Sequence, residues 1–139
     1  MIDEQALATK IETMLVMQNE MNAAVDADWL ARARPWYRAI WIECAELMDH
    51  YGTWKWWKHG EPDLGQALLE IVDIWHFGLS LRIRRGEPLA DTAAGIARDW
   101  QCRLESRGFL ADVETLAQSA LTERQFKVAV IPVLLGQIG

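Results

Sequence analysis

Residues 64–83 read LGQALLEIVDIWHFGLSLRI, and this stretch decides the fold. Wound at 3.6 residues per turn, it carries apolar side chains on every side, which is typical of a helix buried in a bundle or a membrane. It also contains two acids and a histidine, so it falls short of the roughly 18 uncharged apolar residues that a membrane span needs. We therefore expect 64–83 to be the buried central helix of an all-α bundle.

The two acids in this helix, Glu70 and Asp73, are three residues apart and lie on neighbouring faces one turn along. A buried carboxylate without a partner is costly, and no lysine or arginine precedes Arg82 in the helix. A second pair with the same spacing, Glu43 and Glu46, lies on the preceding predicted helix. Glu43 falls inside the apolar sector of that helix, which a solvated charge would avoid. Four carboxylates between two helices predict a divalent cation site.

The ligand chemistry narrows the choice of cation. All-oxygen ligation favours Mg²⁺ or Mn²⁺ over zinc. A di-iron bundle would need Glu-x-x-His twice, and only Asp73-x-x-His76 approximates that motif. Magnesium sites usually combine a few carboxylates with substrate phosphates, and such ions help water to attack phosphorus. These residues predict metal-assisted hydrolysis of a phosphorylated substrate without naming the substrate.

Length and composition indicate one folded domain. The chain has 139 residues, and its net charge of -6 argues against binding to a nucleic-acid backbone. The two cysteines lie in helical patterns without a disulfide framework, and the N-terminus lacks the pattern of a signal peptide. We expect a cytoplasmic protein with no nucleic-acid or membrane partner.

The apolar periodicity predicts a bundle of about five to six helices, with no strand-forming alternation. The expected ranges are 3–24, 35–51, 64–83, 89–107 and 109–121. A sixth helix would be capped by Thr122 and would place Phe126, Val130 and Leu134 on one side.

Seven of the eight tryptophans lie between Trp29 and Trp75. We expect three of them to pack in the core, namely Trp36, Trp41 and Trp75. The segment WKWW, at 54–57, lies between helices and is flanked by a second lysine. Its indoles form either a packing plug or a stacking surface for a flat ligand. Lys55 and Lys58 are either solvated or placed to meet a polyanion such as phosphate.

Two amides lie one turn apart in the predicted first helix. Gln18 falls in its apolar stripe, and Asn22 follows at the next turn. An amide that faces a core must be hydrogen-bonded. The residues alone favour a structural amide over a base-reading one, although an amide offers both a donor and an acceptor.

The paired acids and the sequence segments around them resemble those of a known family. The pattern Glu43-x-x-Glu46 followed by Glu70-x-x-Asp73 resembles the signature of the all-α nucleoside triphosphate pyrophosphatases, which include the MazG-type enzymes. The segments ECAELMD, TWKWWK and EIVDIWHF are similar to the dimeric dUTPase branch, as are Gln18, Asn22 and Trp29 in the first motif. The resemblance covers 14–81.

This resemblance implies a function and a role for each matching residue. Mg²⁺ would be held by Glu43, Glu46, Glu70 and Asp73, and Glu43 would polarise the attacking water. The uracil edges would be read by Gln18 and Asn22, contrary to the structural interpretation above. Trp57 would help enclose the base, and Phe77 would pack on the sugar and disfavour a 2′-hydroxyl. From their position beside the indoles, we also expect Lys55 and Lys58 to lie near the phosphates. The implied reaction converts dUTP, and in this family dUDP, to dUMP.

The C-terminal part departs from the family pattern, because no basic residue follows Lys127. In the family, a later helical motif supplies lysine, arginine and asparagine side chains to the phosphates and the base. The single pyrophosphatase domain at 1–139 is then either truncated at its C-terminus, a compact variant, or completed by a partner subunit. The C-terminal segment of the chain is apolar, and so is the long predicted helix 64–83. A second copy of the chain could cover these apolar surfaces, so we expect a homodimer.

Three other interpretations remain open at this point. One is a MazG-type house-cleaning pyrophosphatase with another nucleotide specificity. Another is a non-catalytic nucleotide-binding or dimerisation protein. The last is an ordinary helical bundle whose buried acids are paired by arginines such as Arg34, Arg38 or Arg98.

Overall fold

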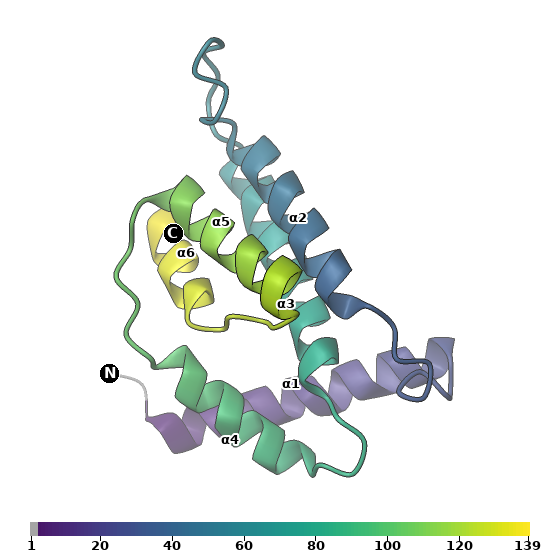
Figure 1. Ribbon diagram of the computed structural model, residues 1–139. Coiled ribbons are helices and arrows are strands. Elements are labelled where there is room, and N and C mark those ends of the chain that lie inside the picture. Colours follow the sequence, from purple (N-terminus) through teal and green to yellow (C-terminus); the bar gives the residue numbers. More distant parts are fainter. Residues whose placement is uncertain (1–2) are drawn as a thin grey trace.

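The computed structural model describes residues 3–139, which form an all-α bundle (Figure 1). No strand occurs in this part of the chain. The helices are α1 (Glu4–Val25), α2 (Trp36–Tyr51), α3 (Leu64–Arg82), α4 (Leu89–Trp100), α5 (Phe109–Gln118), a π-helical turn (Ser119–Glu123) and α6 (Val130–Ile138). The predicted fold class is confirmed, and none of these helices is long and apolar enough to cross a membrane.

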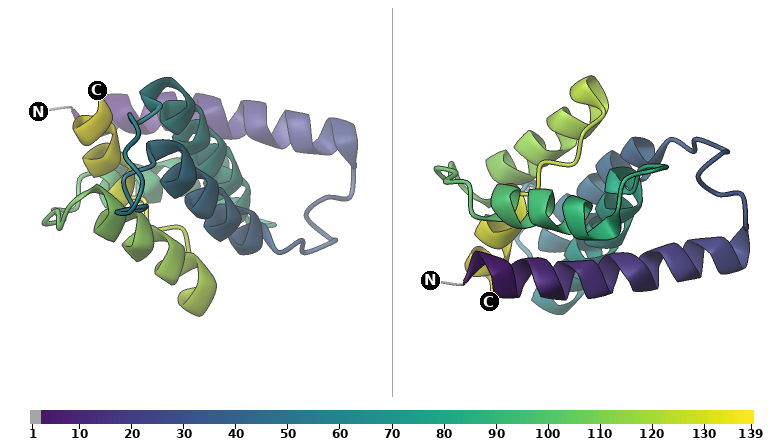
Figure 2. Two further views of the ribbon diagram at one scale, coloured as in Figure 1. Left: turned by 90° about the horizontal axis from the view of Figure 1, so that it is seen from above. Right: turned by 90° about the horizontal axis from the view of Figure 1, so that it is seen from below.

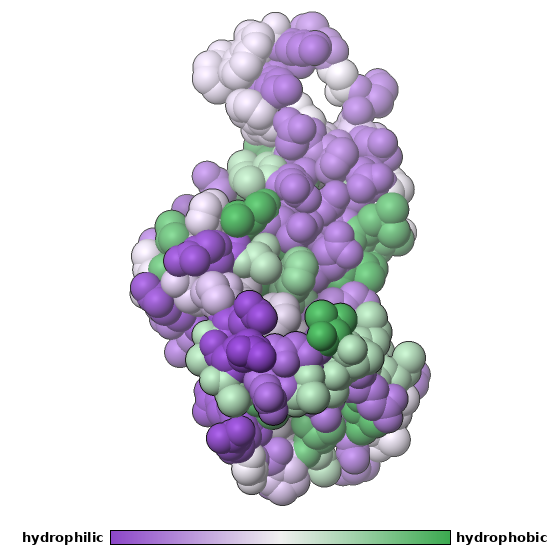
Figure 3. Space-filling model, turned by 90° about the vertical axis from the view of Figure 1, so that its right-hand side faces the viewer, coloured by the Kyte–Doolittle hydropathy of each residue, from purple (hydrophilic) through white to green (hydrophobic). Residues whose placement is uncertain are grey.

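Helices α2 and α3 form an antiparallel hairpin whose ends are set by local chemistry (Figure 1). At the end of α2, Gly52 adopts a left-handed conformation with φ 81°, and its N–H donates to the carbonyl of Met48. At the start of α3, the Asp63 side chain accepts the N–H of Gln66 at 3.0 Å. The loop between them stands clear of the rest of the molecule, at the top of Figure 3.

The other helices cover the hairpin from two sides. Helices α1 and α4 lie side by side across its lower end, and α5 and α6 pack together beside it (Figures 1 and 2). The largest fully buried side chains come from most of these helices and include Leu15, Ile40, Leu47, Ile71, Ile74, Leu79, Ile96, Leu116 and Leu134. The three tryptophans predicted to pack in the core are partly buried against it.

Helix α3 is central, but it is not buried on every side as its sequence predicts. Its N-terminal half leaves Leu64, Leu68, Leu69 and Val72 exposed. Side-chain hydrogen bonds from α1 reach the second half of α3, between positions 75 and 80. The apolar stripe of α1 is likewise only partly covered, since Ile11, Leu15 and Gln18 are buried while Met14, Met21 and Val25 are exposed.

The predicted fourth helix is too long. The observed helix α4 ends at Trp100 rather than near Arg107, because the segment that follows makes hydrogen bonds with α5. The Ser106 hydroxyl and the Arg107 N–H both donate to the Asp112 carboxylate in the first turn of α5. A continuous helix would hold those two donors in a different place.

The predicted fifth and sixth helices also need correction. Helix α5 stops at Gln118 and gives way to the π-helical turn, so Thr122 lies within that turn and caps nothing. The turn ends at Arg124, whose φ of 56° is left-handed. Phe126 therefore precedes α6 instead of belonging to it, and its ring is buried against α3.

Candidate metal and nucleotide site

The acidic cluster consists of Glu43 and Glu46 from α2 and Glu70 from α3. One carboxylate oxygen from each of these residues lies within 4.8 Å of the others. Glu70 is 5% exposed, Glu43 is half-buried and Glu46 is exposed. The cluster thus runs from the α2–α3 contact out to solvent, which leaves a side from which a ligand can approach.

Two oxygens of this cluster lack a donor when its carboxyl groups are ionised. Oε2 of Glu43 and Oε2 of Glu70 are then buried and accept no hydrogen bond from residues 3–139. Within residues 3–139, no ion pair joins an arginine to the cluster. Arg34 instead lies near Asp26 at 3.6 Å. Buried carboxylate oxygens without donors are costly, so a divalent cation fits this donor set.

The protonation of the cluster reflects this crowding. Burial, hydrogen bonding to Glu70 and the nearby Glu46 carboxylate raise the pKa of Glu43 to about 8. The pKa of Glu70 is lowered, first by hydrogen bonding with Glu43 and then, against its own burial, by Gln66. Two close carboxyl groups that share one proton behave in this way. Without a cation, the proton resides on Glu43.

Two neighbours of Glu70 were not singled out from the sequence. The Gln66 amide donates to Oε1 of Glu70 at 3.0 Å, and Nε2 of His50 lies 3.5 Å from the same oxygen. Gln66 precedes Glu70 by one helical turn, so the i, i+4 spacing could have indicated this contact. His50 comes from the end of α2, and only the α2–α3 packing brings it to Glu70.

The remaining α3 residues of the predicted site continue along the helix away from the cluster. Asp73 is exposed and does not belong to the group of three carboxylates. Phe77, one turn further, stacks on Trp36 with ring centroids 6.2 Å apart. The stack gives Phe77 a fixed, half-buried ring one turn beyond Asp73.

The two predicted amides join α1 to α3 near this stack. Nε2 of Gln18 donates to Oδ1 of Asn22 at 3.0 Å, and Nδ2 of Asn22 donates to the Ser80 hydroxyl at 2.9 Å. Oε1 of Gln18 lies 2.7 Å from Nδ1 of His76. Gln18 is therefore hydrogen-bonded, as predicted, to the side chains of Asn22 on α1 and His76 on α3.

A hollow of about 230 Å³ lies next to Ser80. Its other walls include Trp29, Trp36 and Tyr37. Trp36 is the ring on which Phe77 stacks, so the hollow adjoins both the stack and the amides. An aromatic-walled hollow with polar groups at one edge suits a flat heterocycle.

The tryptophan-rich loop lies at the opposite end of α3. Trp57 is exposed and packs edge-on against Trp54 and Trp56. Lys55 lies 3.6 Å from Asp49 and over the Trp54 ring, and Lys58 is exposed.

The amide end of α3 is remote from this loop. The loop precedes residue 64 and the amides meet α3 at 76, a separation of about 18 Å along a helix. One chain alone does not bring Trp57 to Gln18.

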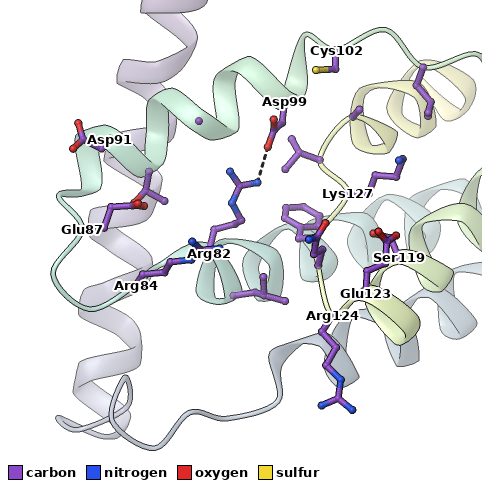
Figure 4. Close-up of a pocket in the computed structure, with 18 of the residues that line it drawn as sticks. Arg82, Arg84, Glu87, Asp91, Asp99, Cys102, Ser119, Glu123, Arg124 and Lys127 are labelled. Carbon is purple, nitrogen blue, oxygen red and sulfur yellow. Dashed lines mark hydrogen bonds and ion pairs between the residues drawn. The ribbon is translucent and has the colours of Figure 1, made fainter.

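A wider cleft of about 550 Å³ lies beyond the C-terminal end of α3 (Figure 4). Its lining mixes both charges, and Arg82 reaches across it to Asp99 at 2.8 Å. None of the three clustered glutamates lines it. The carboxylate oxygens without donors lie elsewhere, and they indicate the chemistry better than the volume of this cleft does.

Comparison with known proteins identifies the family. A family model described as dUTPase matches residues 10–127, which is most of the chain. The protein belongs to this all-α dUTPase family, whose activity is dUTP diphosphatase. The matched range contains the acidic cluster, both amides and Phe77. No curated protein and no solved structure matches the chain.

Proposed function

We propose that the protein hydrolyses dUTP, and also dUDP, to dUMP with the help of Mg²⁺. The observation that carries this proposal is the pair of buried, unpartnered oxygens on Glu43 and Glu70, inside the region that matches the dUTPase family. Water would attack the phosphate chain, so that dUTP yields dUMP and pyrophosphate and dUDP yields dUMP and phosphate.

The residues that would hold the cation are Glu43, Glu46 and Glu70, with Asp73 joining from the next turn of α3. A bound Mg²⁺ would neutralise charge on the phosphate oxygens and lower the pKa of a bound water. Mn²⁺ prefers similar oxygen ligands and is an alternative.

Glu43 is the best placed of these acids to take a proton from water. It is half-buried, between the deep Glu70 and the exposed Glu46. Glu70 is kept in position by Gln66 and His50, which both meet Oε1.

The nucleotide would lie along α3, with its phosphates at the acidic cluster and its base near α1. Phe77 would pack on the sugar and leave no room for a ribose 2′-hydroxyl. Gln18 and Asn22 would read the uracil edges. Trp57 would close over the base, and Lys55 and Lys58 would meet the phosphates, after movement of the loop or from a second subunit.

A homodimer is part of this proposal. The exposed large apolar residues on α1 and α3 are Met14, Val16, Met17, Met21, Val25, Leu64, Leu68, Leu69 and Val72. Met14 meets the Trp75 indole N–H at 3.3 Å, so the two groups adjoin across the α1–α3 contact. A monomer rarely leaves so many large apolar side chains uncovered, and a second copy would cover them symmetrically.

A cytoplasmic location also remains a proposal. Both cysteines are free thiols, Cys44 in the core and Cys102 on the surface. An exposed thiol without a disulfide partner suits a reducing compartment.

The decisive experiment is dUMP release from dUTP and dUDP with Mg²⁺, compared with dTTP, dCTP and UTP. We expect turnover of the two deoxyuridine nucleotides, and its loss in Glu43→Ala. Glu114→Ala is the control, because Glu114 is an exposed glutamate of α5 that lies outside the cluster. Phe77→Ala should raise the relative rate with UTP.

The alternatives predict different results. A MazG-type enzyme would hydrolyse several nucleotides without preferring uracil. A non-catalytic protein would bind dUTP with Mg²⁺ and release no dUMP. Either result would overturn the proposed function.

The homodimer is tested separately by light scattering on the purified chain. Leu68→Glu should give a folded monomer, whereas Glu114→Lys, an exposed change on α5, should leave the mass unchanged. A monomeric wild-type protein would refute the dimer.

A further inference from the structure

Four hydrogen bonds close a ring between α1 and α3. His76 Nδ1 pairs with Gln18, Gln18 donates to Asn22 and Asn22 donates to Ser80, over distances of 2.7, 3.0 and 2.9 Å. The Ser80 hydroxyl then donates to the backbone carbonyl of His76 at 3.1 Å. The ring therefore begins and ends at His76.

The direction of every bond follows from that carbonyl, which can only accept. The Ser80 hydroxyl must donate its single proton to the His76 carbonyl, so Asn22 must donate an N–H to the Ser80 oxygen. The Asn22 carbonyl then faces the Gln18 N–H, and the Gln18 carbonyl faces His76. Nδ1 of His76 must carry a proton, in either the neutral or the charged imidazole.

The reversed ring is less favourable. If Ser80 donated to Asn22 instead, both amides would flip, and His76 would accept at Nδ1. The bond from Ser80 to the His76 carbonyl would be lost, leaving three bonds in place of four. One neutral hydrogen bond corresponds to a preference of roughly fivefold.

We propose that His76 and Ser80 are positioning residues that fix the amide orientations of Gln18 and Asn22, and thereby select uracil over cytosine. This inference rests on the proposed base-reading role of the two amides. Neither residue needs to touch the nucleotide. Ser80 is 2% exposed and acts through Asn22, while His76 acts through Gln18.

The two pyrimidines differ in the order of their donors and acceptors. Uracil presents a carbonyl and an N–H where cytosine presents an amino group and a bare ring nitrogen. An amide of fixed orientation matches one order and opposes the other, whereas a freely flipping amide accommodates both. Thymine has the same order as uracil, so the ring does not distinguish between those two bases.

The experiment measures binding of the α,β-imido analogues of dUTP, dCTP and dTTP with Mg²⁺, because they bind without being hydrolysed. We expect Ser80→Ala and His76→Leu each to lower the dUTP-to-dCTP affinity ratio by about fivefold. The dUTP-to-dTTP affinity ratio should stay unchanged. His76→Asn, which keeps a donor near the Nδ1 position, should restore most of the preference. Ser119→Ala, an equally small change at another buried serine, should alter neither ratio.

A second measurement needs no variant or ligand. Nitrogen NMR shifts of the wild-type protein should show His76 protonated at Nδ1 when its imidazole is neutral. A neutral His76 protonated at Nε2 would overturn the inference. So would an unchanged dUTP-to-dCTP ratio in the variants, or an equal fall in both ratios.

Failure of the proposed function looks different. In that case the analogues would bind with the expected ratios, but dUTP itself would release no dUMP. Equal binding of all analogues to the wild-type protein would overturn the inference, whatever the turnover assay gives.

Discussion

The Phe126 ring lies directly on the backbone of α3 at Gly78. A Cβ atom added to Gly78 would stand 2.3 Å from both Cδ2 and Cε2 of that ring. Both residues are buried, and the Trp75 ring meets Phe126 edge-on at 5.9 Å. The glycine thus lets the segment before α6 pack against the central helix more closely than any other residue would permit.

Gly78→Ala should therefore destabilise the protein, although alanine is the better helix former. Forcing an extra methyl group into a packed core costs about 1–3 kcal/mol, which exceeds the propensity gain of about 1 kcal/mol. We expect a lower urea midpoint with an unchanged slope. Gly136→Ala is the matched control, because it lies in α6 with no atom within 4 Å of the added Cβ, and it should be neutral or stabilising. Equal stability of the two variants would contradict this packing.

Asp112 is a second point where distant segments meet. Its carboxylate accepts hydrogen bonds from the Ser106 hydroxyl, the Arg107 N–H and the Gln137 amide of α6. Burial opposes ionisation of Asp112, but these bonds hold its pKa below the usual value.

Asp112→Ala should cost about 2 kcal/mol, because it removes a charged acceptor shared by three donors. Asp91→Ala, which removes an exposed acid from the first turn of α4, should cost only a few tenths of a kcal/mol. Chemical denaturation measures both. Asp112→Ala should also speed hydrogen exchange in α6, through the loss of its bond to Gln137. Unchanged exchange there would refute the proposed link.

The sequence predicts the first three helices well because their boundaries have local causes. Pro35 precedes α2, Gly52 ends it and Asp63 caps α3, and each of these signals is visible in the chain. The C-terminal helices lack such signals. Their limits depend on tertiary contacts, such as Phe126 on Gly78, which no periodicity reveals.

The candidate site, too, could be predicted from the sequence only in part. The i, i+3 spacing on α2 and α3 correctly predicted that Glu43, Glu46 and Glu70 meet. Spacing alone could not predict that Asp73 lies outside that cluster, because its position depends on how α3 is rotated against α2. The hydrogen-bond ring escaped prediction for a related reason, since it needs the exact crossing of α1 over His76 and Ser80.

Divalent cations should stabilise the folded protein through the acidic cluster. A ligand that binds only the native state raises the melting temperature. At a concentration 100 times Kd, it adds about 2.7 kcal/mol to the free energy of unfolding. We expect Mg²⁺ to raise the melting temperature of the wild-type protein and of Asp49→Asn. Glu70→Gln should respond little, because it keeps the shape of the side chain but loses the charge. An equal response of Glu70→Gln and the wild type would place the cation elsewhere.

Without cations, stability should depend on pH through Glu43. Its folded-state pKa is raised from 4.5 to about 8, so the native state binds more protons than the unfolded state within that window. Stability then falls as pH rises, since the proton held by folded Glu43 is lost as pH approaches 8. In EDTA, the melting temperature should decline between about pH 5 and about pH 8, and Glu43→Gln, which cannot titrate, should show a flatter profile. Mg²⁺ should flatten the wild-type profile too, because a cation stabilises the ionised carboxylates. A wild-type profile in EDTA as flat as that of Glu43→Gln would mean that Glu43 is already ionised in the folded protein.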